Sequence, residues 1–164
     1  MSELSHEQIA EFWHRSYASV DGLWFMKVEE KYGFDTALDI DNEVWKILPK
    51  IQARILKSMA GAKSGMEGLL ECLKSKLNLE GFVFRAERTR DGVGLRITLS
   101  RCPWHDLMVK SGREELSGKV GTLICNTEYS VWASEFGANI QFELKGQICT
   151  GGKSCVLAFQ QTAS

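Results

Sequence analysis

The sequence lacks a large net charge, a long apolar run and the pattern of an export signal. Its net charge is −1 over 164 residues, so no basic surface predicts nucleic acid or an anionic membrane as a partner. No apolar run reaches the roughly 20 residues that a membrane-spanning helix needs. The first residues lack the basic start and apolar core of a signal peptide. We therefore expect a cytoplasmic protein with reduced thiols and no membrane partner.

Several common site motifs are also missing. Gly118–Thr122 lacks the spacing of a phosphate-binding loop, and neither a Cys-x2-Cys pair nor a ferredoxin spacing occurs. Five cysteines, an odd number, fit poorly with a disulfide framework. Hydrophobic residues at 44% and charged residues at 25% are ordinary for a globular protein. We expect one domain over 1–164, in which the clustered cysteines serve metal or redox chemistry.

Residues 1–79 carry the spacing of amphipathic helices and form the expected helical part. Asp21–Gly22 should end the first helix, because glycine favours helix ends. Pro49 should kink or restart a later helix, since it cannot donate the helical hydrogen bond. The last helix of this part, 66–79, carries Cys72, which we interpret as a core thiol.

Residues 80–164 form the expected metal-binding α+β part. From Gly81 the apolar residues alternate with a period of two, which is typical of half-buried strands. Asp91–Gly92 is a strong hairpin signal. The order ββααββ predicts an antiparallel sheet with helices on one side. The expected elements are strands 82–87 and 93–100, helices 103–110 and from Ser117 or Gly118 to 136, and strands 139–147 and 155–159.

The strongest functional signal is a group of cysteines in the C-terminal third. Cys102 and His105 are three residues apart, which places both on one helical face if Pro103 begins a helix. Cys149 and Cys155 flank a Gly-Gly turn that can bring them together. Thiolate and imidazole are the ligands that zinc prefers, although the same thiolates could hold an iron–sulfur cluster, and haem is not excluded. Cys125 is the remaining candidate in this region.

The same residues allow other interpretations. The cysteines could be separate buried thiols, and His105 could lie beside the site without binding a metal. A cysteine at a helix N-terminus has a lowered pKa, so Cys102 could be a nucleophile assisted by His105 or Asp106. A metal with an open coordination position could also activate water. The residues alone leave a binding module and an enzyme both open.

Two sets of residues carry a resemblance to known families. The first set is Asp21–Phe25, Val28–Gly33, Ala37, Asp41 and Val44–Trp45, and the second is Cys125 with Cys149 and Cys155 before Phe159. Together, over nearly the whole chain, they resemble a family of unknown function that is grouped with L-2-amino-thiazoline-4-carboxylic acid hydrolase-like proteins. The C-terminal half also resembles the 4-vinyl reductase domain, which is related in fold to TRAPP-type tethering subunits.

The second resemblance implies a zinc site beside a pocket for an apolar or aromatic molecule. Its thiolate ligands would be Cys125, Cys149 and Cys155. Gly146 stands where the family pattern has a glutamate ligand, so the fourth ligand is open. Cys102 is our first choice, followed by His105 and Glu143.

The resemblances also imply partners and an alternative activity. We expect Trp24, Trp104 and Trp132 to contact the small molecule. Since tethering relatives dimerise through helices, the helical part could form a homodimer. A hydrolase-like enzyme is the alternative function, with a metal-bound water or Cys102 as the nucleophile.

Overall fold

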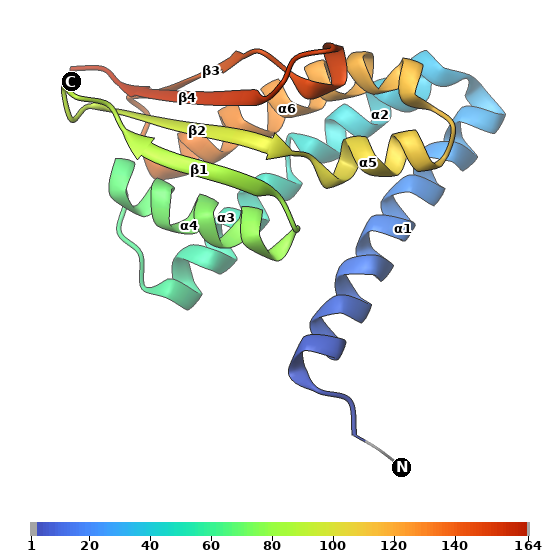
Figure 1. Cartoon of the computed structure of the whole chain (residues 1–164), viewed down its shortest axis with the longest axis horizontal. Helices are drawn as coiled ribbons and strands as arrows, with labels where there is room; N and C mark the ends of the chain where they lie inside the picture. The colour runs from blue at the N-terminus through green and yellow to red at the C-terminus, as the bar shows by residue number, and fades with distance from the viewer. Residues whose placement is uncertain (1–2, 164) are drawn as a thin grey trace. The chain divides into compact units, whose positions relative to one another are not determined.

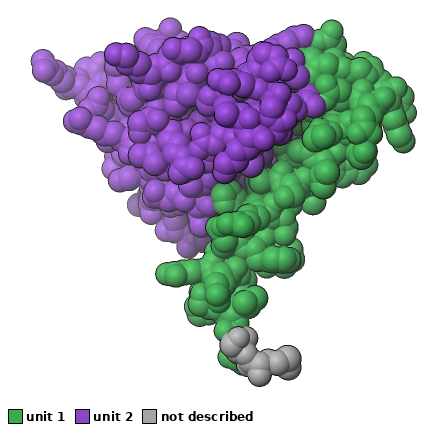
Figure 2. All heavy atoms as spheres, turned by 45° about the vertical axis from the view of Figure 1, so that its right-hand side comes forward, with its two compact units in different colours: residues 1–43 green, residues 44–164 purple. Residues whose placement is uncertain are grey.

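The computed structural model describes residues 3–163 (Figure 1). The chain divides into two compact units, residues 1–43 and 44–164 (Figure 2). This boundary lies well before residue 79, where the sequence pattern changes from helical to alternating. Among the described residues, no helix combines the length and apolar character that crossing a bilayer requires.

The first unit contains α1 (His6–Tyr32) and most of α2 (Phe34–Trp45). The helix α1 starts at a capping box, in which the Gln8 amide donates to Ser5 Oγ over 3.2 Å. It continues through Asp21–Gly22, so the expected break there is wrong. One glycine inside a helix costs only about 1 kcal/mol, which a helix of 27 residues can absorb. Gly33, with φ +85°, ends it instead.

The second unit begins with two helices, α3 (Leu48–Ala60) and α4 (Met66–Leu79). Pro49 lies in the first turn of α3, where its missing N–H would have no helical partner in any case. The predicted restart is therefore confirmed. The helix α4 has the predicted bounds and buries Leu69, Leu73 and Leu77.

The sheet is antiparallel throughout, with strand order β1-β2-β4-β3. Its helices α4 and α6 contact the strands (Figure 1), which confirms the predicted α+β fold. The helix α6 begins at Glu114, three residues before Ser117, because two glutamates suit the positive end of a helix. The elements are β1 (Val83–Arg88), β2 (Gly94–Arg101), α5 (Pro103–Lys110), α6 (Glu114–Phe136), β3 (Ile140–Lys145), the 3₁₀ turn η1 (Ile148–Thr150) and β4 (Cys155–Gln161).

The core lies on one face of the two central strands. On β2, Leu95 and Ile97 are buried, and the register sets them opposite Phe159 and Leu157 of β4, which are also buried. Cys155 shares this face and lies opposite Leu99. The register therefore fixes Cys155 at the edge of the core where β2 ends and β4 begins.

Candidate functional site

Cys102 and Cys155 lie at the same end of neighbouring strands. Cys155 begins β4 and lies opposite Leu99 of β2. Cys102 follows the last residue of β2 and stands at the N-cap of α5. Because the two strands are antiparallel, the end of one meets the start of the other. The sheet therefore brings together two cysteines that are 53 residues apart in the chain.

Cys149 packs on the helix that carries Cys125. It lies in η1, and a Cβ atom built on Gly121 of α6 would be 2.8 Å from Cys149 Sγ. Cys125 is one helical turn beyond Gly121, on the same face of α6. The absence of a side chain at Gly121 is what allows the sulfur atom of Cys149 to approach the helix.

The four thiols influence one another's ionisation. Burial raises the pKa of Cys125 well above its usual range, and the charges of Glu128, Cys102, Cys155 and Cys149 raise it further. Burial likewise raises the pKa of Cys102 to about 11, with contributions from Cys155 and Cys149, and the pKa of Cys149 is raised by burial and then by Cys155. Every pair among the four thiols is therefore within electrostatic range.

The four thiols are farther apart than the ligands of a formed metal centre. Within residues 3–163, no three cysteine, histidine, aspartate or glutamate side chains have the spacing of a metal site. The four sulfur atoms would have to draw closer together to share one ion. Cys72 stands apart on α4, where burial and Glu71 raise its pKa and Lys57 lowers it.

Backbone amides point at two of the sulfur atoms. The Ile148 amide donates to Cys155 Sγ over 3.2 Å. The amides of His105 and Trp104 lower the pKa of Cys102, as expected at a helix N-terminus. Burial nevertheless outweighs them, so the expected low pKa of Cys102 is wrong. A mostly protonated thiol is a poor nucleophile, which disfavours Cys102 as a catalytic residue.

The two other candidate ligands differ in position. His105 lies on α5, and its Nδ1 atom is 2.7 Å from the Oγ atom of the buried Ser117. Glu143 lies on β3 with 68% of its side chain exposed, and it pairs with Lys145 over 2.9 Å. Its neighbours Phe142 and Leu144 point to the core side. The structure therefore does not bring Glu143 to the thiols.

Gln147 supplies a further polar group near the cysteines. Its side chain accepts a hydrogen bond from Thr122 over 2.8 Å through Oε1. Its buried Nε2 atom has no hydrogen-bond partner among residues 3–163 and lies 3.9 Å from the Cβ position of Gly121. Since Cys149 packs at Gly121, this amide group is a donor beside its sulfur atom.

The three tryptophans that we expected to contact a ligand lie in different settings. Trp24 of α1 is 69% exposed. Trp104 packs edge-on against Trp45, with ring centroids 6.0 Å apart. Trp132 is fully buried and stacks on Phe136. None of the three tryptophans lines either of the two described grooves.

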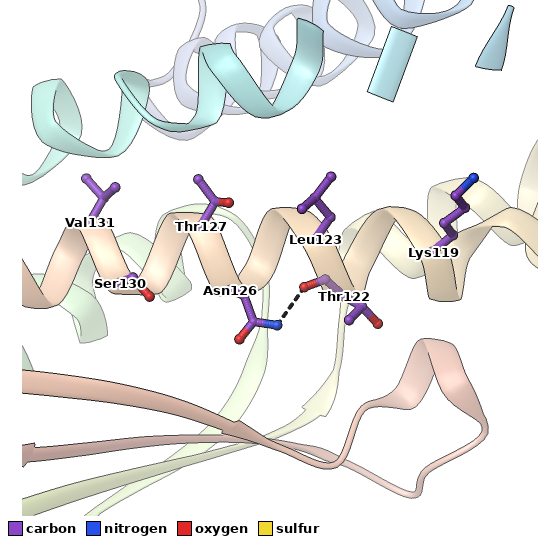
Figure 3. A pocket seen from close by; sticks show the side chains of 7 residues that line it. All are labelled: Lys119, Thr122, Leu123, Asn126, Thr127, Ser130 and Val131. Carbon is purple, nitrogen blue, oxygen red and sulfur yellow. Dashed lines mark hydrogen bonds between the residues drawn. The ribbon is translucent and has the colours of Figure 1, made fainter. Parts of the chain in front are cut away.

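The larger of these grooves, of about 800 Å³, is open and runs along α6 (Figure 3). All its lining residues come from this helix, namely Lys119, Thr122, Leu123, Asn126, Thr127, Ser130 and Val131. Helical geometry puts Gly121 and Cys125 on the other side of α6. A smaller groove of about 400 Å³ lies on α4. Neither groove is next to the thiols.

Sequence reasoning missed a buried charged group that borders the thiols. Lys76 Nζ lies 2.6 Å from Glu128 Oε1 and 2.8 Å from Glu80 Oε2, and all three side chains are buried. Burial lowers the pKa of Lys76, but Glu128 and Glu80 outweigh it and hold the pKa above its usual range. We call these residues the buried triad. Glu128 also raises the pKa of Cys125, and among the causes of that shift only burial is larger.

The sequence did contain a signal for the buried triad. Lys76 and Glu80 are four residues apart and continue the apolar stripe of α4 that holds Leu73 and Leu77. Glu128 lies beside Tyr129 on α6, and both residues are buried. Charged residues at core positions of a helix are rarely buried unless they are paired, so their positions pointed to a pair.

A family model for a family of unknown function, DUF6125, matches residues 2–145. The chain belongs to this family. The match includes Cys102 and Cys125 and ends before Cys149 and Cys155. No curated protein matches the DUF6125 chain. The family description carries no activity, so it leaves the function open.

Two solved structures share the fold of the DUF6125 chain. The phenol-responsive sensory domain of the transcription activator PoxR, solved with phenol, has 14% identity and a TM-score of 0.51 over 88% of this chain and 73% of its own. The trafficking protein particle complex subunit 3 from Naegleria fowleri, covalently bound to palmitic acid, has 12% identity and a TM-score of 0.56. That match covers 93% of this chain and 97% of the subunit. The predicted likeness to TRAPP-type folds is confirmed, whereas the hydrolase resemblance stays a prediction.

Proposed function

We propose that this DUF6125 protein binds one metal ion, zinc in the first place, through Cys102, Cys125, Cys149 and Cys155. The observation that carries the proposal is that the fold brings the cysteines together in pairs. Cys102 follows β2 at the end where Cys155 begins β4, and Cys149 packs at Gly121, one helical turn before Cys125 on α6. Cys72 lies on α4, and no thiol contributes to its raised pKa. Four thiolates are a complete ligand set for tetrahedral zinc. Such a closed set favours a structural or ligand-sensing role over catalysis by a metal-bound water.

The surroundings of the sulfur atoms support this proposal. Amide donors to Cys155 and Cys102 stabilise the thiolate form, and the free Nε2 atom of Gln147 adds a donor near Cys149. Outer groups of this kind orient and tune metal ligands. Without a metal the buried thiols stay protonated, which avoids uncompensated charge. A bound cation would offset the charge of the thiolates.

We also propose that the protein binds a small apolar or aromatic molecule. The support is the fold, which it shares with a domain solved with phenol and with a subunit bound to palmitic acid. The described grooves lie away from the thiols, so the ligand and the metal need not touch. Titration with phenol and with palmitate tests this half. Saturable heat or a raised melting temperature with either probe supports it, and no effect from both contradicts it.

The metal content of the purified protein tests the proposed zinc site. Protein loaded with zinc and then desalted should hold one equivalent, and serine at Cys125 or Cys155 should reduce this to well below half an equivalent. Cys72→Ala is the matched control, because it removes a buried thiol outside the group, and it should keep the full equivalent. An absorbance spectrum identifies iron–sulfur or haem instead. Zinc below about 0.2 equivalents with all thiols free to react would refute the proposal.

Alanine at Gly121 should weaken metal binding by about tenfold or more. Alanine is the better helix former by up to about 1 kcal/mol, but its methyl group would lie 2.8 Å from Cys149 Sγ and displace that ligand. The control is Gly22→Ala in α1, where a Cβ atom meets nothing within 4 Å. Zinc affinity is measured by competition with a chelator. Equal affinities of the two variants would contradict the placement of Cys149.

A further inference from the structure

The buried triad holds more negative than positive charge. Lys76 Nζ pairs with the carboxylates of Glu80 and Glu128, at 2.8 Å and 2.6 Å. Contact with an ammonium group favours the charged form of a carboxylate, and the two carboxylates in turn keep the pKa of Lys76 above its usual range. One cation therefore faces two anions, and the triad carries one net negative charge inside the protein.

Glu128 brings this charge next to the thiols. It lies three residues after Cys125 on α6, so the two side chains share one face of the helix, with about 5–6 Å between their Cβ atoms. Gly121, against which Cys149 packs, is one turn earlier on the same face. Glu80, the other anion, directly follows α4. Of the charged groups around Cys125, Glu128 contributes most to its raised pKa.

The surroundings of the triad let this charge act over a distance. Lys76 Nζ lies 5.7 Å from the ring centroid of Phe82 and 5.7 Å from that of Tyr129. Tyr129 is buried and follows Glu128 directly in α6. Because apolar groups screen a charge far less than water does, the charge of Glu128 reaches the neighbouring turn of the helix.

A metal bound by four thiolates adds charge of the same sign. Zinc carries two positive charges and the thiolates carry four negative ones, so the proposed centre has two net negative charges. The same thiols in their protonated form have none. Like charges close to one another are disfavoured, so the triad opposes the metal-bound state more than the metal-free state.

We infer that Glu128 limits the affinity of the thiol site for zinc, a role that rests on the proposed zinc site. Its carboxylate opposes the charge of the metal–thiolate centre. Lys76 offsets that effect only in part, because it is shared with Glu80. The centre therefore holds its metal less tightly than four thiolates alone would. Such a site exchanges its metal, which suits a sensing role better than a purely structural one.

Competition between the full chain and a chelator tests this role. Glu128→Gln removes the charge but keeps the size of the side chain and an oxygen atom that accepts from Lys76. The variant should bind zinc more tightly than wild type, by about tenfold or more. A damaged fold would weaken binding, so a gain in affinity separates an effect of charge from a structural defect.

Glu80→Gln is the matched control, because it removes the same charge from the triad and leaves Glu128 beside Cys125. Its zinc affinity should rise by no more than about threefold. The uncharged variant Lys76→Met/Glu80→Gln/Glu128→Gln is a second test, since it keeps no ion of the triad that could be left unpaired. It should also bind zinc more tightly than wild type. Urea unfolding of the metal-free proteins checks that each variant folds.

Equal zinc affinities of wild type and Glu128→Gln would overturn the inference. Weaker binding by that variant would overturn it as well, because Glu128 would then support or bind the metal. An equal gain in Glu80→Gln would show that the net charge of the triad, and not the position of Glu128, sets the affinity. A wild-type protein without zinc would refute the zinc site and the inference with it. The metal content of the wild type thus separates failure of the site from failure of the inference.

Discussion

Zinc affinity should rise by about 10,000-fold for each pH unit between pH 6 and pH 8, tenfold for each of four released protons. Burial raises the pKa of Cys125, Cys102, Cys149 and Cys155 above the usual thiol value, so all four are protonated in this range. Zinc binds thiolates, and every proton that leaves on binding makes the affinity change about tenfold per pH unit. Raising the pH removes protons that compete with the metal, so affinity increases with pH.

Two readouts check this slope. Competition with a chelator of known pH dependence gives the affinity, and dye absorbance in weakly buffered solution counts the protons released. Serine at Cys102 should lower both the slope and the count by about one. An affinity that stops rising above pH 7 would point to histidine and carboxylate ligands, whose protons are already lost there. That result would contradict the thiol site.

Methionine at Lys76 should destabilise the protein by about 3–5 kcal/mol. The substitution keeps an unbranched side chain of similar length but leaves Glu80 and Glu128 buried without their cation, and an unpaired buried charge is costly. Lys74 lies on the same helix and is exposed. Its replacement by methionine should change the free energy of unfolding by no more than about 0.5 kcal/mol.

Urea unfolding of both variants measures this difference. A third variant, Lys76→Met/Glu80→Gln/Glu128→Gln, should recover much of the loss, because it removes the unpaired charges together with the cation. Equal costs at Lys74 and Lys76 would show that the triad contributes nothing. No recovery in the triple variant would show that packing, and not charge, causes the loss.

Much of the fold could be predicted from local pattern. Three signals each act over a few residues: the change of period at Gly81, the turn signal at Asp91–Gly92 and the proline at 49. Each lies at a boundary of the structure, where the strands begin, where β1 turns into β2 and where α3 begins. The expected break at Asp21–Gly22 failed for an energetic reason. A glycine lowers helix stability by only about 1 kcal/mol, and the residues on both sides of it favour the helix.

The candidate site could be predicted only in part. The position of Glu143 was readable, since the alternation that turns Phe142 and Leu144 inward turns the residue between them outward. Two other features could not be predicted from the sequence. They are the register that sets Cys155 at the end of β2 and the packing of Cys149 on Gly121. Both depend on contacts between distant segments, and no local pattern encodes them.

The buried triad shows a different limit. By residue type alone Lys76, Glu80 and Glu128 would be assigned to the surface, because charged side chains usually lie there. Their positions on the apolar faces of α4 and α6 contradicted that rule. Residue type alone therefore does not predict the pairing of Lys76 with the two glutamates, whereas the positions of these residues along each helix indicate it.

X-ray absorption at the zinc edge tests the central claim most directly. Zinc-loaded protein should show a shell of four sulfur atoms at about 2.3 Å, the usual zinc–thiolate distance. Serine at Cys149 should reduce the shell to three sulfur atoms, while Cys72→Ala should leave all four. A shell of nitrogen and oxygen atoms at about 2.0–2.1 Å, or a four-sulfur shell that loses a member when Cys72 is removed, would contradict the account.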